Sequence, residues 1–221
     1  MPPTEAQTNE PLTALPRSFY NRDPVTVARA LLGKVLVRRF GRSTMSGRIV
    51  EIEAYLGADD AAAHSAAGRT ERNAIIFGPP GRAYVYFIYG VHYCLNVSCM
   101  PPGDAGCVLI RALEPLTGLR VMAKNRGIAG ETLSLTQLRS LTSGPGRLCQ
   151  ALNITRPRDN GCDVTDPGSG LWIADDGFKS SKIVATPRIG ITKSAAAELR
   201  FVLPKNPFVS GPRAASSATR R

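Results

Sequence analysis

The clearest alternation of apolar and polar residues in the chain is the stretch GRIVEIEAY, which ends at Tyr55. Successive side chains of a strand point to opposite faces, so its valine, second isoleucine and alanine share one face, which we expect to be core. Glu51, Glu53 and Tyr55 share the other face, and the loop that follows returns an imidazole at His64. The pattern predicts a slot lined by a carboxylate, a phenol and an imidazole. A surface strand with solvated glutamates is the alternative.

Further apolar and β-branched runs predict strands, and capping residues mark short helices between them. Asp23 and Pro24 supply the N-cap and first turn of a helix that ends near Gly33. The predicted strands are 34–40, 47–55, 107–113, 170–173, 188–191 and 201–203, with a polar turn at 41–46, and the remaining predicted helices are 116–125, 137–141 and 147–152.

The stretch YVYFIYGVHYCLNVS, residues 84–98, predicts two strands that meet at a tight turn with Tyr89 at or near its tip. An aromatic ring on a protruding tip suits a wedge between stacked bases. A ring that folds back onto its own hairpin is the alternative. Asn96 follows in an apolar strand, where a buried amide either reads the edge of a ligand or ties down backbone.

Arginine side chains add two further candidates. Arg111 lies in the middle of the apolar run CVLIRAL and requires an acidic partner, for which the glutamate strand is the obvious source. SGPG at 143–146 opens a helix whose free N–H groups, together with Arg147, suit a phosphate contact, or else simply cap the helix. The small, polar and basic stretch 58–80 is expected to be an irregular loop packed over the slot, or a mobile insertion.

The net charge of the chain restricts the classes of binding partner. The chain of 221 residues has 28 basic and 17 acidic residues, a net charge of +11, which favours a polyanion, either nucleic acid or an anionic membrane surface. The hydrophobic content of 43% is enough for one large domain, which we expect at 17–210 between disordered tails at 1–16 and 211–221. Neither a membrane span nor a signal peptide is recognised, so we expect a soluble intracellular protein that is not held at a membrane.

Metal-ligand patterns are weak in this sequence. The five cysteines form no Cys-x-x-Cys pair, and the two histidines are His64 and His92. A zinc site is therefore not expected, and reduced, mostly buried thiols are the prediction.

Several separate segments agree in sequence, spacing and order with one known family. They are GRIVEIEAYLGADDAAAHS, YVYFIYGVHYCLNVS, CVLIRALEPLTG, SGPGRLCQALNI and RIGIT. Over about residues 17–210 the chain resembles the alkyladenine (3-methylpurine) DNA glycosylases of the animal type. The resemblance implies an α+β fold, a single mixed domain in which helices surround a curved antiparallel β-sheet with a protruding β-hairpin. It also implies that the helix-hairpin-helix module of other glycosylases is absent.

The resemblance further assigns roles to individual residues. Glu53 matches the general base of the family and Arg111 the arginine that helps to hold the attacking water. The implied contacts of the flipped base and the DNA are Tyr55 on one face of the base, His64 and Tyr86 on its other face, Asn96 as the pocket-floor amide that rejects guanine, and Tyr89 as the intercalating tyrosine. Ile76 stands where the family has a methionine beside the wedge, and with Arg147 it is a weaker DNA-binding candidate.

The implied activity is monofunctional excision of alkylated purines such as 3-methyladenine and 7-methylguanine from duplex DNA, with hypoxanthine and ethenoadenine as further candidates. No metal, cofactor or Schiff-base lysine is expected, and the protein is expected to act as a monomer on DNA, in the cytoplasm or nucleoid of a bacterium or the nucleus of a eukaryote. Two alternatives remain open. A hydrolase of free nucleosides would not need Tyr89 or the charge of +11, and a non-catalytic nucleic-acid binder would not need Glu53 with Arg111.

Overall fold

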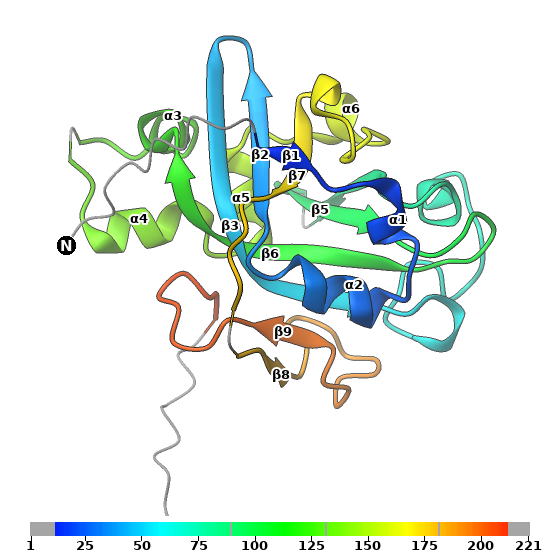
Figure 1. The fold of residues 1–221 in the computed structure, drawn as a ribbon. Helices are drawn as coiled ribbons and strands as arrows, with labels where there is room; N and C mark the ends of the chain where they lie inside the picture. The colour runs from blue at the N-terminus through cyan, green and yellow to red at the C-terminus, as the bar shows by residue number, and fades with distance from the viewer. Residues whose placement is uncertain (1–11, 89, 131, 181, 212–221) are drawn as a thin grey trace, which may run out of the picture.

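The computed structural model describes residues 12–211 except 89, 131 and 181. Its strands form one antiparallel sheet that curls through the centre of the molecule (Figure 1). The strands are β1 (Thr13–Ala14), β2 (Val35–Phe40), β3 (Ser43–Tyr55), β4 (Ala83–Ile88), β5 (His92–Ser98), β6 (Cys107–Thr117), β7 (Leu171–Asp175), β8 (Val184–Thr186) and β9 (Arg200–Val202). The main path is β1-β7-β2-β3-β6-β5-β4, and β9 pairs with both β3 and β8.

Short helices pack around this sheet, which confirms the predicted α+β class. They are α1 (Arg17–Tyr20), α2 (Pro24–Leu31), α3 (Leu119–Asn125), α4 (Leu135–Thr142), α5 (Pro145–Ala151) and α6 (Arg156–Asp159). The predicted N-cap of α2 is present, since the Asp23 carboxylate accepts the N–H of Thr26 at 2.9 Å and Pro24 begins the helix. No helix in the described ranges is long and apolar enough to cross a membrane.

The side chains of the long strand β3 alternate between two faces, as the sequence predicts. Val50, Ile52 and Ala54 are buried in the main core, together with apolar residues of α2, α3, α4 and α5. Glu51 and Glu53 lie on the opposite face and are also fully buried, so the solvated alternative is wrong for them. The register between β3 and β6 shifts around Glu51, and such bulges bend a strand and re-aim its side chains.

Three predicted boundaries are wrong. The segment 188–191 is not a strand, because the chain leaves the sheet after β8 and runs past the end of β3. The strand predicted to end before Glu114 continues to Thr117, since Pro115 pairs with Gly47 at a register shift, and α3 therefore begins only at Leu119. The expected turn at 41–46 is shorter, because β3 already begins at Ser43.

Ordered chain also begins before the predicted boundary at residue 17. Thr13–Ala14 extends the sheet by pairing with Asp175 and Ala174 of β7. Of the two predicted tails, residues 1–11 and 212–221 lie outside the described residues.

Candidate active site

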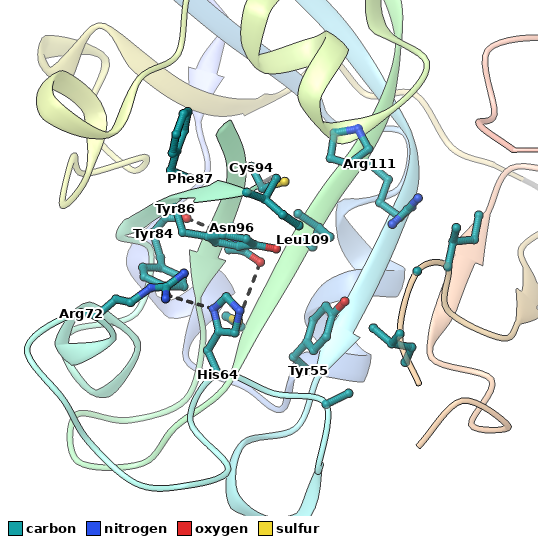
Figure 2. A pocket seen from close by; sticks show the side chains of 17 residues that line it. Tyr55, His64, Arg72, Tyr84, Tyr86, Phe87, Cys94, Asn96, Leu109 and Arg111 are labelled. Carbon is teal, nitrogen blue, oxygen red and sulfur yellow. Dashed lines mark hydrogen bonds between the residues drawn. The ribbon is translucent and has the colours of Figure 1, made fainter. Parts of the chain in front are cut away.

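A cavity of about 390 Å³ opens beside the C-terminal end of β3. β4, β5 and β6 supply one part of its wall (Figure 2). The end of β3, the loop after it, the start of α5 and the segment 189–191 supply the rest. Its lining is Tyr55, Ala62, His64, Arg72, Tyr84, Tyr86, Phe87, Ile88, Cys94, Asn96, Cys107, Leu109, Arg111, Pro145, Ile189, Gly190 and Ile191. The cavity therefore combines several aromatic rings with few charged side chains.

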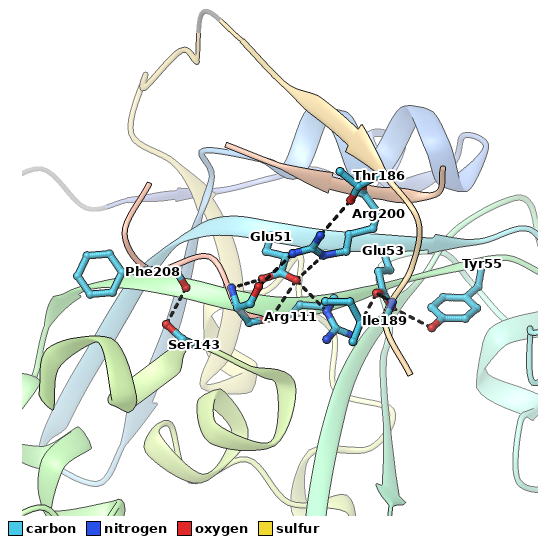
Figure 3. A network of polar contacts seen from close by, with 10 residues as sticks. Glu51, Glu53, Tyr55, Arg111, Ser143, Thr186, Ile189, Arg200 and Phe208 are labelled. Atoms are coloured by element: carbon cyan, nitrogen blue, oxygen red, sulfur yellow. Dashed lines mark hydrogen bonds and ion pairs between the residues drawn. The ribbon is translucent and has the colours of Figure 1, made fainter. Parts of the chain in front are cut away.

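Glu53 lies behind this wall and is 0% exposed. Its Oε1 accepts the backbone N–H of Ile189 at 2.8 Å and lies 3.1 Å from Nη1 of Arg111, while Oε2 accepts the Tyr55 hydroxyl at 3.0 Å (Figure 3). All three partners line the cavity. One carboxylate is thus oriented by three donors at the edge of a pocket.

Arg111 joins Glu53 to a second buried carboxylate. Its Nε donates to Oε1 of Glu51 at 3.0 Å, and Glu51 also accepts Nε of Arg200 at 2.7 Å and the N–H and hydroxyl of Ser210 at 2.6 and 2.9 Å. Burial alone would lower the pKa of Arg111, but the charges of Glu53 and then Glu51 raise it, so the guanidinium remains protonated. The acidic partner that the sequence required for Arg111 is confirmed in the glutamate strand.

Tyr55 forms one wall of the cavity and is supported from outside. The guanidinium carbon of Arg188 lies 4.6 Å from the centre of its ring. Burial, and next the charge of Glu53, raise the pKa of Tyr55, so its hydroxyl keeps the proton that it donates to Glu53. Arg188 in turn pairs with Asp60 in the loop after β3.

His64 and two tyrosines of β4 face Tyr55 across the cavity (Figure 2). The His64 and Tyr86 rings meet edge to face with centres 4.5 Å apart, and Nδ1 of His64 is 3.0 Å from the Tyr84 hydroxyl. Partial burial of the imidazole, and then the nearby charge of Arg72, lower the pKa of His64 below its usual 6.5. The imidazole is therefore mainly neutral at pH 7.

Asn96 of β5 is 3% exposed and lines the inner part of the cavity. Its Nδ2 donates to the Tyr84 carbonyl at 3.3 Å, and its Oδ1 lies 4.0 Å from the Cys107 thiol. The side chain is thus held in one orientation, while part of its hydrogen-bonding capacity is weakly used.

The predicted hairpin is formed by β4 and β5, and Phe87 and Ile88 at the end of β4 line the cavity. Val91 donates its N–H to the Ile88 carbonyl at 3.3 Å across the turn, and Gly90 has a positive φ of 68°. Phe87 and Val91, near the tip, are 45% and 67% exposed. Tyr89, predicted as the wedge, lies outside the described residues.

Comparison with known proteins identifies the family. Residues 18–207 match the family described as methylpurine-DNA glycosylase. A protein of Koribacter versatilis named "Putative 3-methyladenine DNA glycosylase" is 62% identical over 202 residues, which cover 91% of this chain and 95% of the relative. Proteins of the same name from Alkaliphilus oremlandii and Mesorhizobium japonicum are 46% and 48% identical, over 89% of this chain in both cases and 98% and 90% of the relatives.

The chain belongs to the methylpurine-DNA glycosylase family. The resemblance noted in the sequence is thereby confirmed. As a member of this family the protein is a DNA glycosylase, an enzyme of DNA repair whose substrate is DNA.

In this methylpurine-DNA glycosylase the structure describes every predicted site residue except Tyr89. Tyr55, His64, Tyr86, Asn96 and Arg111 line one cavity, and Glu53 is bonded to its wall. Arg147 is exposed at the start of α5, where Nη1 donates to the Ser143 carbonyl at 3.5 Å.

Ile76 is the prediction that the structure corrects. Its side chain is 0% exposed and packs with Tyr84 and Cys107 in a small apolar cluster behind the cavity. In this conformation its side chain therefore offers no exposed surface to DNA.

Sequence reasoning missed the outer support of the glycosylase cavity. Arg188 and Asp60 were not singled out, although an arginine beside the apolar residues IGI carries the same signal that identified Arg111. The contact of the Ile189 N–H with Glu53 joins residues 136 positions apart, and no local pattern predicts it. In the described part of the chain, no group of three or more His, Cys, Asp or Glu side chains could hold a metal ion.

Proposed function

We propose that this DNA glycosylase rotates a damaged purine out of duplex DNA into the cavity and hydrolyses its N-glycosidic bond, with Glu53 as the general base. The observation that carries the proposal is the arrangement of Glu53. It is a buried carboxylate oriented by Tyr55, Arg111 and the Ile189 N–H at the edge of an aromatic pocket. The substrates would be alkylated purines such as 3-methyladenine and 7-methylguanine, with hypoxanthine and ethenoadenine as neutral substrates.

The aromatic walls support selection of such bases. A flat purine would stack on Tyr55, with His64 and Tyr86 on its other side. An alkylated purine that carries a positive charge gains about 0.5 to 2 kcal/mol from the face of an aromatic ring, which a neutral base does not gain. The lowered pKa of His64 supports this selection, because a neutral imidazole does not repel a cationic base. Asn96 would reject guanine through a clash with its exocyclic amino group.

The chemistry that this site suits needs only one carboxylate. Glycosidases use two, one as acid for the leaving group and one as base or nucleophile. A cationic purine leaves as a neutral base with the electron pair of the broken C1′–N bond, so its departure needs no proton. Glu53 would take a proton from the water that forms the new C1′–O bond, and Arg111 would orient this water. A lyase step through a lysine is not part of the proposal.

Access to Glu53 sets a structural requirement. Because Glu53 is 0% exposed and its Oε2 accepts the Tyr55 hydroxyl, a water molecule would reach Oε2 only after Tyr55 shifts. A base that stacks against Tyr55 is in the right place to cause such a shift. Hydrogen bonds of active sites are often completed only in the substrate complex.

The DNA-binding part of the proposal rests on the hairpin and the charge. Tyr89 would fill the gap left by the flipped base, and the exposed Phe87 and Val91 would lie near the flanking bases. Arg147 would contact the phosphate backbone, and the net charge of +11 would attract the protein to DNA. We assign these functions to a single domain, about 17–210, that acts as a monomer, and the three arginines of the C-terminal end 211–221 would add only non-specific attraction.

One assay separates this proposal from a nucleoside hydrolase and from a non-catalytic binder. Purified protein is incubated with duplex oligonucleotides that carry one 7-methylguanine, hypoxanthine or ethenoadenine, and in parallel with the corresponding free nucleosides. We expect base release from the duplexes, abasic products without strand cleavage, and no release from the nucleosides. Release from the nucleosides at a similar rate, or DNA binding without release of any base, contradicts the proposal.

A further inference from the structure

Arg188 is a buried cation that contacts the aromatic wall of the cavity from outside. Its guanidinium carbon lies 4.6 Å from the centre of the Tyr55 ring, and its side chain is 0% exposed. Tyr55 lines the cavity, whereas Arg188 does not. The ring therefore separates Arg188 from any base that stacks on the cavity side of Tyr55.

Asp60 neutralises this cation. Nη2 of Arg188 donates to Oδ1 of Asp60 at 2.8 Å, and Nη1 donates both to the other carboxylate oxygen and to the Ala54 carbonyl, the latter at 2.9 Å. The Asp60 side chain is only 2% exposed. Since both partners are shielded from solvent, the charge of Arg188 is balanced chiefly by Asp60 rather than by water.

Neutralisation of Arg188 by Asp60 affects the binding of a positively charged base. Such a base on the cavity face would lie roughly 3.5 Å from the ring. Added to the 4.6 Å behind the ring, this places it about 8 Å from the guanidinium. An unbalanced charge at that distance weakens binding of a cation by roughly twofold at the dielectric constant of water and roughly thirtyfold at an effective value of about 20. A neutral base does not experience this repulsion.

We propose that Asp60 is a specificity-determining residue that acts through Arg188. By neutralising the guanidinium behind Tyr55, it keeps the stacking face favourable for positively charged purines while Arg188 still supports the ring. The inference rests on the proposed function, because it requires that bases stack on Tyr55. It goes beyond that function by assigning the preference for charged over neutral bases partly to a pair outside the cavity.

Asp60 also has a structural role, and the test must separate the two. Its carboxylate accepts the N–H groups of Leu56 and Ala62 at 3.3 and 3.1 Å, so it orders the loop that leads to His64. Loss of this loop geometry would lower the release of all bases. A change of charge, in contrast, would alter the ratio of charged to neutral bases.

The experiment compares Asp60→Asn, Arg188→Gln and the double variant with the parent enzyme. Single-turnover release of 7-methylguanine, as the cationic base, and of hypoxanthine, as the neutral base, is measured from matched duplexes with enzyme in excess over DNA, at saturating and at sub-saturating enzyme concentrations. In Asp60→Asn we expect the ratio of cationic to neutral release to fall by roughly twofold to thirtyfold. In Arg188→Gln the unpaired carboxylate attracts cations, so the ratio should rise, and the double variant should return towards the parent.

A second pair in the protein provides a matched control. Arg48 lies over the Phe178 ring at 4.1 Å and pairs with both oxygens of Asp176 at 3.0 and 2.7 Å, but none of these residues lines the cavity. Asp176→Asn should leave the ratio unchanged. Because a ratio is measured on one preparation, a loss of folded protein lowers both rates equally and does not produce the expected shift.

The outcomes distinguish the inference from the proposed function. If the parent releases neither base, the proposed function fails. If the parent releases both bases and the ratio stays the same in Asp60→Asn and Arg188→Gln, or moves in the same direction in both, the inference is wrong and the proposed function stands. Should Asp60→Asn fail to fold, Arg188→Gln still carries the prediction of a raised ratio, against the unchanged ratio expected in the control Asp176→Asn.

Discussion

Replacement of Glu53 by glutamine is the sharpest test of the proposed chemistry, because the site can retain its geometry without the base. The glutamine amide has nearly the same shape as the carboxylate. Its oxygen can accept the Ile189 N–H and Arg111 Nη1, now 2.8 and 3.1 Å away, while its NH₂ group faces the Tyr55 hydroxyl. That hydroxyl can accept as well as donate, so the three contacts persist with one of them reversed.

The expected decrease in the rate of base release follows from the loss of the general base. An amide cannot take a proton from water, and loss of a general base typically slows the chemical step by ~10² to 10⁴, or about 3 to 5 kcal/mol in the barrier. The loss of folding stability should be smaller than this loss in the barrier. Arg111 keeps its 3.0 Å contact with Glu51, so the loss is closer to one charge-assisted hydrogen bond, about 1.5 to 3 kcal/mol, than to an unpaired buried charge.

Single-turnover base release from a duplex with one lesion, at saturating enzyme, measures the chemical step, and a binding titration on the same duplex serves as the control for DNA affinity. Glu51→Gln is the matched variant. Glu51 lies on the same strand, is also 0% exposed and also bonds Arg111, but it does not contact Tyr55 or Ile189. We expect a much smaller loss of release there. Near-normal release by Glu53→Gln, or equal losses in both variants, would refute the assignment of Glu53 as base.

Three further predictions test other parts of the proposal. Asn96→Ala should raise the release of undamaged guanine from duplex DNA, and no rise in a folded variant would leave Asn96 with the structural contact to the Tyr84 carbonyl alone. Tyr89→Ser should reduce release most from well-paired lesions and least from single strands, because the empty stack then costs a few kcal/mol, and the fluorescence of ethenoadenine, which brightens on unstacking, reports the shift directly. Hydrogen bonds from Lys34 and Arg48 hold the pKa values of Asp175 and Asp176 below their usual value. Both carboxylates therefore stabilise the fold above about pH 4, and this stabilisation is lost as the pH falls through the lowered pKa values. Denaturant titrations from pH 5 to pH 2 should therefore show a falling free energy of unfolding, with a smaller fall in Asp176→Asn.

The parts of the site that sequence predicted are those fixed by local pattern. Alternation along β3 identifies which residues share the face with Glu53, because a strand has a side-chain period of two. Arg111 required a buried acid, since a charged side chain in an apolar strand is too costly to leave unpaired, and the only acidic residues on a neighbouring predicted strand were those of β3. The first inference needed only the residues of β3, and the second needed only one neighbouring strand.

The parts that sequence did not predict depend on distant segments. Arg188 and Asp60 are 128 positions apart, and neither residue lies in a regular element that fixes its partner. The segment around Arg188 has the apolar composition of a strand, but it serves instead to place one N–H group against Glu53. The bulge in β3 was equally invisible, because it arises from the pairing with β6 and not from the residues of β3 alone.

Charge balance links the predicted and the unpredicted parts of the site. The acidic groups Glu51, Glu53 and Asp60 are met by the basic groups Arg111, Arg188 and Arg200, each within hydrogen-bonding distance of at least one partner of opposite sign. A buried network of this kind is stable only when every charge is matched, so a single neutralising substitution leaves a net charge next to Tyr55 or Glu53. Because the charges of the network are matched before DNA binds, the site distinguishes incoming bases by their charge. The effect of each substitution on cationic and neutral bases therefore reports which charge it leaves unmatched.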